Sequence, residues 1–187
     1  MSKPLTALGF LSIQHDAGGW FGGYLVTNLW GRPLEFRLTS AVNPNRIQQI
    51  LYGQTLAEYV CAEVIGKALF DKTSTTPQLL LTDEPAAVAL RALVNIPTVW
   101  VCDNAPAHAP AHAPAHGPAH ALATLRDFVA VDAARRPALQ TLTRFADDAP
   151  LIADLLGQLG NLDLAEPFHR IREAVTEARR LGAGSRP

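Results

Sequence analysis

Apolar and polar residues between positions 8 and 42 form the short, alternating runs that are typical of β-strands. The pattern predicts three strands, over residues 8–14, 20–28 and 34–41, with glycine-containing turns between them. In the third run, apolar residues alternate with polar ones, so that one face carries Leu34, Phe36 and Leu38 and the other Glu35, Arg37 and Thr39. This alternation indicates an antiparallel strand with one face toward solvent.

A helical spacing of apolar residues follows and predicts one long helix over residues 44–70, which Asn43 and Pro44 would begin. Residues 78–82 contain the apolar run Leu79-Leu80-Leu81 and are interpreted as a buried strand. A short helix over 83–94 and another apolar strand over 96–102 come next. The order strand, helix, strand predicts a parallel pair joined by a crossover.

The composition changes at residues 105–120, which are four tandem tetrapeptides of the form Ala/Gly-Pro-Ala-His. Proline at every fourth position removes helix donors, so a semi-rigid, exposed linker is expected. After it, residues 125–131 fit either a helix or a strand, and helices are predicted near 137–145, 151–159 and 167–181. The predicted organisation is a mixed α/β domain over 1–104, the linker, and a helical C-terminal segment over 121–187.

Charge and cysteine content restrict the class of protein. The 187-residue chain has a net charge of −1, so it has no global field that would collect nucleic acid or anionic lipid. Its two cysteines, Cys61 and Cys102, lie in apolar surroundings that suit buried thiols rather than a disulfide framework. No run approaches the roughly 20 apolar residues of a membrane span. A cytoplasmic protein without membrane association is therefore expected.

The repeated histidines are the most conspicuous candidate metal ligands, because neutral imidazole binds zinc, copper or nickel. The intervening prolines prevent the helix that would align them, so a spacer is the preferred interpretation and no cofactor is predicted. The candidates are His108, His112, His116 and His120. Arginines of the last predicted helix are balanced by glutamates and are interpreted as a solvated face; they are Arg170, Arg172, Arg179 and Arg180.

Motifs of the common hydrolases, redox proteins and zinc proteases are missing from the sequence. The glycine-rich run at residues 18–23 lacks the lysine and the strand-to-helix placement of a phosphate loop. It is interpreted as a tight turn followed by a bulge or a close backbone approach at Gly22 and Gly23.

Several short segments and the order of elements over residues 8–103 resemble the ribonuclease H-like fold. The segments are Gly22-Gly23-Tyr24-Leu25-Val26, Asn45-Arg46 and Leu80-Leu81-Thr82-Asp83. The resemblance implies a mixed five-stranded sheet, with three antiparallel strands and then two parallel strands joined by helices, followed here by a C-terminal helical tail.

The resemblance also implies carboxylates gathered around two magnesium ions, which prefer oxygen ligands. Asp83 matches the aspartate at the end of the fourth strand. The first strand has Ile13 and Gln14 at the position of the family's first aspartate, and Gln48 and Gln49 stand where a glutamate is expected. Neutral amides do not balance two divalent ions, which favours a non-catalytic domain. Under the catalytic alternative, the candidate ligands are Asp16, Glu58, Glu63 and Asp83.

Three hypotheses follow. The first is a non-catalytic module that interacts with a protein partner, and an exposed edge of the antiparallel strands would support it. The second is a magnesium-dependent nuclease or phosphoryl-transfer enzyme acting on nucleic acid, for which the acids must converge. The third is a small-ligand sensor near Asp83 and Asp103, at the carboxyl ends of the parallel strands, and a concave apolar pocket there would support it.

Overall fold

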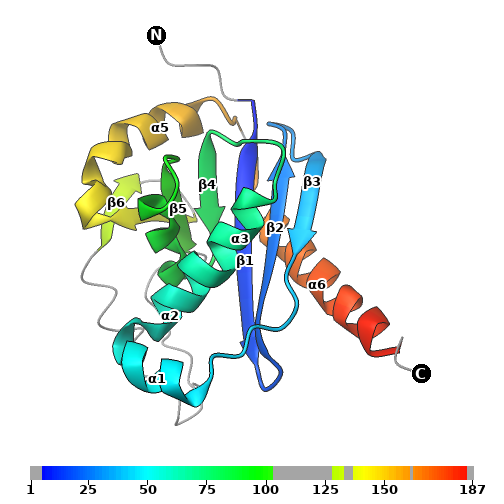
Figure 1. The fold of residues 1–187 in the computed structure, drawn as a ribbon. Coiled ribbons are helices and arrows are strands. Elements are labelled where there is room, and N and C mark those ends of the chain that lie inside the picture. Colours follow the sequence, from blue (N-terminus) through cyan, green and yellow to red (C-terminus); the bar gives the residue numbers. More distant parts are fainter. Residues whose placement is uncertain (1–5, 103–127, 133–136, 161, 185–187) are drawn as a thin grey trace.

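A seven-stranded mixed sheet forms the centre of the protein, in the order β3-β2-β1-β4-β5-β7-β6 (Figure 1). The computed structural model describes residues 6–102, 128–132, 137–160 and 162–184. The strands are β1 (Leu8–Asp16), β2 (Gly19–Thr27), β3 (Pro33–Leu38), β4 (Leu79–Thr82), β5 (Thr98–Cys102), β6 (Phe128–Asp132) and β7 (Ala138–Leu142).

The first five strands have the expected pairing. β1 pairs antiparallel with β2, and β2 with β3, while β4 lies parallel to both β1 and β5. The expected total of five strands is wrong, because β7 pairs antiparallel with β5 and β6 pairs antiparallel with β7. The mixed α/β class is therefore confirmed, with a larger sheet than predicted.

The first half of the predicted helix over 137–145 is wrong, because it forms β7. Residues 125–131, which fitted either a helix or a strand, contain most of β6. Leu139 and Thr141 are buried and alternate with half-buried neighbours, as strand residues do. The hydroxyl of Thr141 donates to the Thr98 carbonyl across the junction with β5, at 3.1 Å. The C-terminal segment is thus not purely helical. The linker over 105–120 lies outside the described residues, and the proposed domain boundaries stay a prediction.

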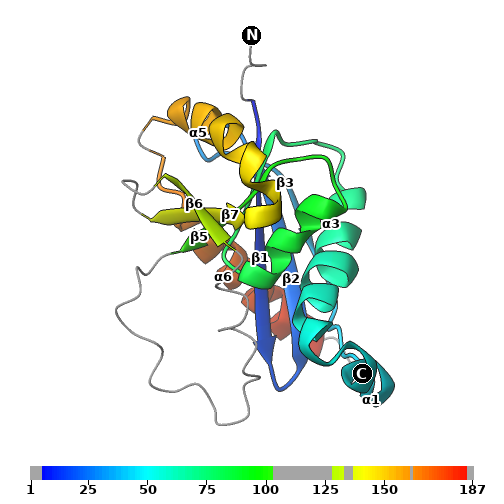
Figure 2. The same cartoon turned by 90° about the vertical axis from the view of Figure 1, so that its left-hand side faces the viewer.

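A run of helical segments covers one face of the sheet in place of the single long helix (Figure 2). Asn45, rather than Asn43, caps its start: the Asn45 side chain accepts from the Gln48 amide, and the Gln48 side chain accepts from the Asn45 amide, both at 2.9 Å. Gly53, at φ +47°, interrupts the run. The segments are α1 (Arg46–Tyr52), η1 (Gly53–Thr55), α2 (Leu56–Glu58), the π-helix η2 (Tyr59–Gly66) and α3 (Lys67–Asp71).

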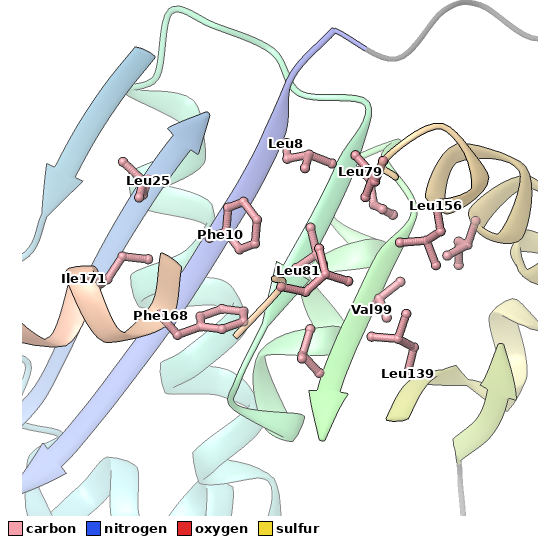
Figure 3. Packing of buried hydrophobic residues seen from close by; sticks show 14 of the residues in the cluster. Leu8, Phe10, Leu25, Leu79, Leu81, Val99, Leu139, Leu156, Phe168 and Ile171 are labelled. Carbon is pink, nitrogen blue, oxygen red and sulfur yellow. The ribbon is translucent and has the colours of Figure 1, made fainter. Parts of the chain in front are cut away.

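Side chains of β4 point alternately into two hydrophobic cores, one on each face of the sheet. Leu80 packs with η2 and with the 3₁₀ helix η3 (Pro85–Ala92), which connects β4 to β5. Leu79 and Leu81 face the opposite core, which contains side chains of α5 (Ala149–Gly157) and α6 (Glu166–Gly184) (Figure 3). Burial on both faces explains why this strand is a continuous apolar run in the sequence.

The last helix returns to the start of the chain and packs across β1 and β2. Phe168, Ile171 and Val175 are almost fully buried, as their spacing of three and four residues predicts. The ring of Phe168 meets that of Phe10 edge to face, with centroids 5.5 Å apart. Within the described parts of the chain, no helix combines the length and apolar character needed to cross a membrane.

The expected close approach at Gly22 and Gly23 is present on both faces of β2. A Cβ at Gly22 would lie against Ile65 of η2 and 3.1 Å from Leu69 of α3. At Gly23, a Cβ would meet Ile171 of α6 and would lie 2.9 Å from Val175 Cγ2. The colliding atoms at Gly23 belong to β-branched side chains, which have little rotamer freedom on a helix.

We therefore predict that Gly23→Ala lowers the free energy of unfolding by about 1–3 kcal/mol, because α6 must shift to make room for one methyl group. The control is Gly157→Ala in α5, where a Cβ would have no neighbour within 4 Å. This control should leave stability unchanged or raise it by up to about 1 kcal/mol, since alanine is the better helix former. Urea unfolding followed by circular dichroism measures both, and equal stabilities of the two variants would contradict the close approach.

Candidate functional site

The carboxylate of Asp83 lies at the carboxyl end of β4, where β1 and α6 meet. Leu11 pairs with Thr82, so the next residue of β1, Ser12, stands beside Asp83. The Ser12 hydroxyl donates to Asp83 Oδ2 at 2.7 Å, and Arg172 Nη1 of α6 donates to the same oxygen at 2.6 Å. The other oxygen, Oδ1, is buried. One carboxylate therefore links two central strands to the last helix.

Burial raises the pKa of Asp83 above its ordinary value of 3.8, although hydrogen bonds from Ser12 and Arg172 act in the opposite direction. The neighbouring Glu84 has a raised pKa for the same reason, and its side chain accepts from the Ala86 amide at the start of η3. Desolvation thus outweighs the guanidinium at Asp83. The ionised form of this group is less favourable in the folded protein than in the unfolded chain.

A hollow of about 240 Å³ lies next to this carboxylate, at the carboxyl ends of the parallel strands β4 and β5. Its lining combines aromatic, apolar and charged side chains: Asp83, Trp100, Val101, Cys102, Ala165, Phe168 and Arg172. This is the region in which a small ligand was expected. Asp103, the other candidate for that role, lies outside the described residues.

Asp16 occupies a separate ion pair at the far end of β1. Arg179 Nη1 donates to Asp16 Oδ2 at 2.7 Å, and its guanidinium lies 3.8 Å from the centroid of the Phe21 ring. The hydrogen bond from Arg179, together with one from the Gly18 amide, lowers the pKa of Asp16. Four residues of extended strand, about 13 Å, separate Asp16 from Ser12.

The two candidate glutamates belong to the opposite face of the sheet. Glu58 ends α2, and its carboxylate lies 3.5 Å from Arg144 Nη2. Glu63 is an exposed residue of η2, whereas Asp16 and Asp83 contact α6. The four candidate acids do not come together. Within the described ranges, no group of three or more His, Cys, Asp or Glu residues is placed to hold a metal ion.

The four candidate histidines, His108, His112, His116 and His120, lie outside the described residues. The arginines of α6, by contrast, differ from the expected solvated face. Arg172 and Arg179 reach the two acids of the sheet, while Arg170 and Arg180 pair with glutamates of their own helix, as expected. Sequence reasoning missed the roles of Ser12, Arg172 and Arg179, because their contacts join residues that are distant in the chain.

The edge strand β3 presents a second feature of functional interest. No strand in the described part of the chain pairs with its outer side. Phe36 lies on the face of the sheet that α6 covers, and Leu34, Phe36 and Leu38 remain 49%, 36% and 44% exposed. On the other face, Glu35 accepts from the amides of Ser74 and Thr75 and from the Arg37 guanidinium. Glu35 and Phe36 thus face opposite sides as predicted, but the apolar side chains of the strand are partly open to solvent, and a β-bulge at Leu34 interrupts the predicted alternation.

Comparisons with known proteins give only distant structural similarity. No protein-family model matches the chain, and no curated protein matches it. Two crystal structures of Ciona intestinalis Endonuclease V with inosine-containing DNA are similar, at 11% and 12% identity and TM-scores of 0.46 and 0.43. They cover 94% and 93% of this chain and 86% and 85% of their own chains. Marinitoga piezophila Argonaute with a guide RNA has 11% identity and a TM-score of 0.29, covering 53% of this chain and 16% of its own. At these scores, the similarity establishes neither a family nor a function.

Because the pKa of Asp83 is raised, we predict that the contribution of this residue to the free energy of unfolding depends on pH. The folded state holds the Asp83 proton more tightly than the unfolded chain does, so this contribution is greatest below pH 3.8 and falls as the pH rises through the raised pKa. Asp83→Asn, which has no such proton, should therefore gain stability relative to the wild type as the pH increases through that interval.

Urea unfolding at a series of pH values measures this difference, with Asp71→Asn, an exposed acid of α3, as the matched control. Asp71→Asn makes the same acid-to-amide change at an exposed site, so the comparison isolates the part of the pH dependence that comes from burial of Asp83. If the free energies of unfolding of Asp83→Asn and wild type change in parallel over the whole series, the predicted effect of desolvation at Asp83 is wrong.

Proposed function

We propose that this chain is a non-catalytic interaction domain, based on the strand arrangement of the ribonuclease H-like fold, that binds a protein partner along β3. The observation that carries the proposal is the outer edge of β3, where apolar side chains are partly exposed and no strand within the described residues pairs with the backbone. Such an edge favours pairing with a strand of another chain.

Ion pairs at Asp83 and Asp16, the two acids that contact α6, support a domain without catalytic activity, called the silent domain below. Asp83 Oδ2 accepts from both Ser12 and Arg172, and Asp16 accepts from Arg179. Each guanidinium supplies the positive charge that a cation would otherwise bring to its carboxylate. Both carboxylates therefore have a cationic partner within the chain itself.

A magnesium-dependent nuclease is the second candidate, and the position of Asp83 at the end of β4, beside β1, favours it. The described residues do not fit the two-magnesium site of that family. Ser12 is a neutral group beside Asp83, Asp16 is about 13 Å farther along β1, and Glu58 and Glu63 belong to the helical run on the opposite face. A single carboxylate is too little negative charge for two divalent ions.

We predict that the purified protein cleaves RNA, DNA and RNA/DNA hybrids in magnesium or manganese no faster than Asp83→Asn does. The reason is that, among the residues that the structure describes, the acids needed to position two metal ions are not gathered at Asp83. Asp71→Asn serves as a matched acid-to-amide control, since Asp71 is exposed on α3 and pairs with Lys67. Metal-dependent cleavage by wild type and Asp71→Asn that is lost in Asp83→Asn would overturn the silent domain and favour the nuclease.

A further inference from the structure

The backbone of β3 directs part of its N–H and C=O groups away from β2, where no strand of the described residues pairs with them. The Thr39 amide donates to the Gly22 carbonyl at 2.9 Å, so the odd-numbered residues of this strand direct their backbone groups toward β2. In an antiparallel ladder the direction alternates from residue to residue. The N–H and C=O groups of Phe36 and Leu38 therefore point away from β2, to the open side, whereas a β-bulge between Pro33 and Glu35 interrupts the alternation at Leu34.

The side chains of β3 have a symmetric order around Phe36. Residues 34–38 read Leu-Glu-Phe-Arg-Leu, so the apolar positions are the same in both directions and the two charges are opposite. If a second copy of this strand is laid antiparallel across Phe36, Leu34 faces Leu38 and Glu35 faces Arg37, each pair occurring twice. The strand is complementary to itself in both hydropathy and charge.

The hydrogen-bonding register agrees with this symmetry. Phe36 would face Phe36 of the second copy as a hydrogen-bonded pair, because both residues direct their backbone groups outward. Glu35 and Arg37 would then form non-hydrogen-bonded pairs, in which opposing side chains lie closest. Arg37 has a half-exposed side chain and already contacts Glu35 of its own strand, at 2.8 Å.

The ring of Phe36 lies on the same face of the sheet as α6. Beside it is a small hollow of about 190 Å³, lined by Leu25, Pro33, Phe36, Arg170, Ile171 and Ala174. A second copy would bring its own Leu34, Phe36 and Leu38 to this edge, where these residues are at present 36% to 49% exposed. Pairing would remove apolar surface from water on both copies.

We propose that β3 is the two-fold interface of a homodimer, in which two sheets join through antiparallel β3 strands centred on Phe36. This inference rests on the proposed function, since it names a second copy of the chain as the partner that binds the β3 edge. A two-fold interface requires one patch to be complementary to itself, and residues 34–38 meet this requirement.

The experiment is sedimentation velocity of the whole chain over about 1 to about 300 µM, because interfaces of one short strand lie at the weak end of protein association. Wild type should shift toward the dimer as the concentration rises. Arg37→Glu places like charges opposite each other twice and should weaken association about tenfold or more. The control Arg46→Glu makes the same charge change on α1, far from β3 in both views of the fold, and should associate as wild type does (Figures 1 and 2).

Mixing two variants tests the register itself. Glu35→Arg alone and Arg37→Glu alone each oppose like charges, but an equal mixture opposes arginine to glutamate at both positions. The mixture should therefore associate more strongly than either variant by itself. Circular dichroism checks that each variant is folded, and if Glu35→Arg is not, because Ser74 and Thr75 lose their acceptor, Arg37→Glu and Arg46→Glu decide the test.

A wild type that stays monomeric up to the highest concentration overturns the homodimer, and so does an Arg37→Glu variant that associates as well as Arg46→Glu. The failure of this inference is distinguishable from failure of the proposed function. A monomer that cleaves no nucleic acid refutes only the homodimer, whereas metal-dependent cleavage refutes the silent domain whatever its oligomeric state.

Discussion

The packing of α6 against Gly23 of β2 determines where the charged groups of the candidate site lie. Gly23 has no side chain, so Ile171 and Val175 come close to the strand backbone. Burial of Phe168, Ile171 and Val175 contributes roughly 1.5–3 kcal/mol for each side chain. The ion pairs of Arg172 and Arg179 have partly exposed side chains, and such pairs contribute about 0–1 kcal/mol each. Apolar packing therefore holds the helix, and the arginines reach the acids as a consequence.

Where one periodicity dominated, the sequence allowed the fold to be predicted. Alternation in residues 34–41 indicated an antiparallel strand, of which residues 34–38 belong to β3, and the apolar run of residues 79–81 indicated the buried strand β4. The strand at Ala138–Leu142 was missed because its short apolar pattern fits a helix as well as a strand. Its assignment depends on pairing with β5, about 40 residues earlier in the chain, which local patterns do not contain.

The candidate site was predictable at one residue only. Asp83 stands at the end of a buried strand, which is a signal that the sequence itself carries. Ser12 and Arg172 reach it from 71 and 89 residues away. The arginines also alternate with glutamates along α6, and this pattern is typical of a solvated helix face. Charge balance within a helix gives no information about which arginine faces a sheet that is formed by distant residues.

The two faces of β3 differ in a way that bears on the role of this edge. Soluble proteins commonly protect an open edge with charges, proline or a bulge. Here Pro33 and the bulge between Val26 and Thr27 protect only the start of the strand. Farther along, Glu35 is used to hold the loop at Ser74 and Thr75, and the apolar side chains of the other face stay partly exposed. Leu34, Phe36 and Leu38 therefore leave an apolar surface at the edge of the described sheet, and in the proposed homodimer this is the surface that a second copy of the strand covers.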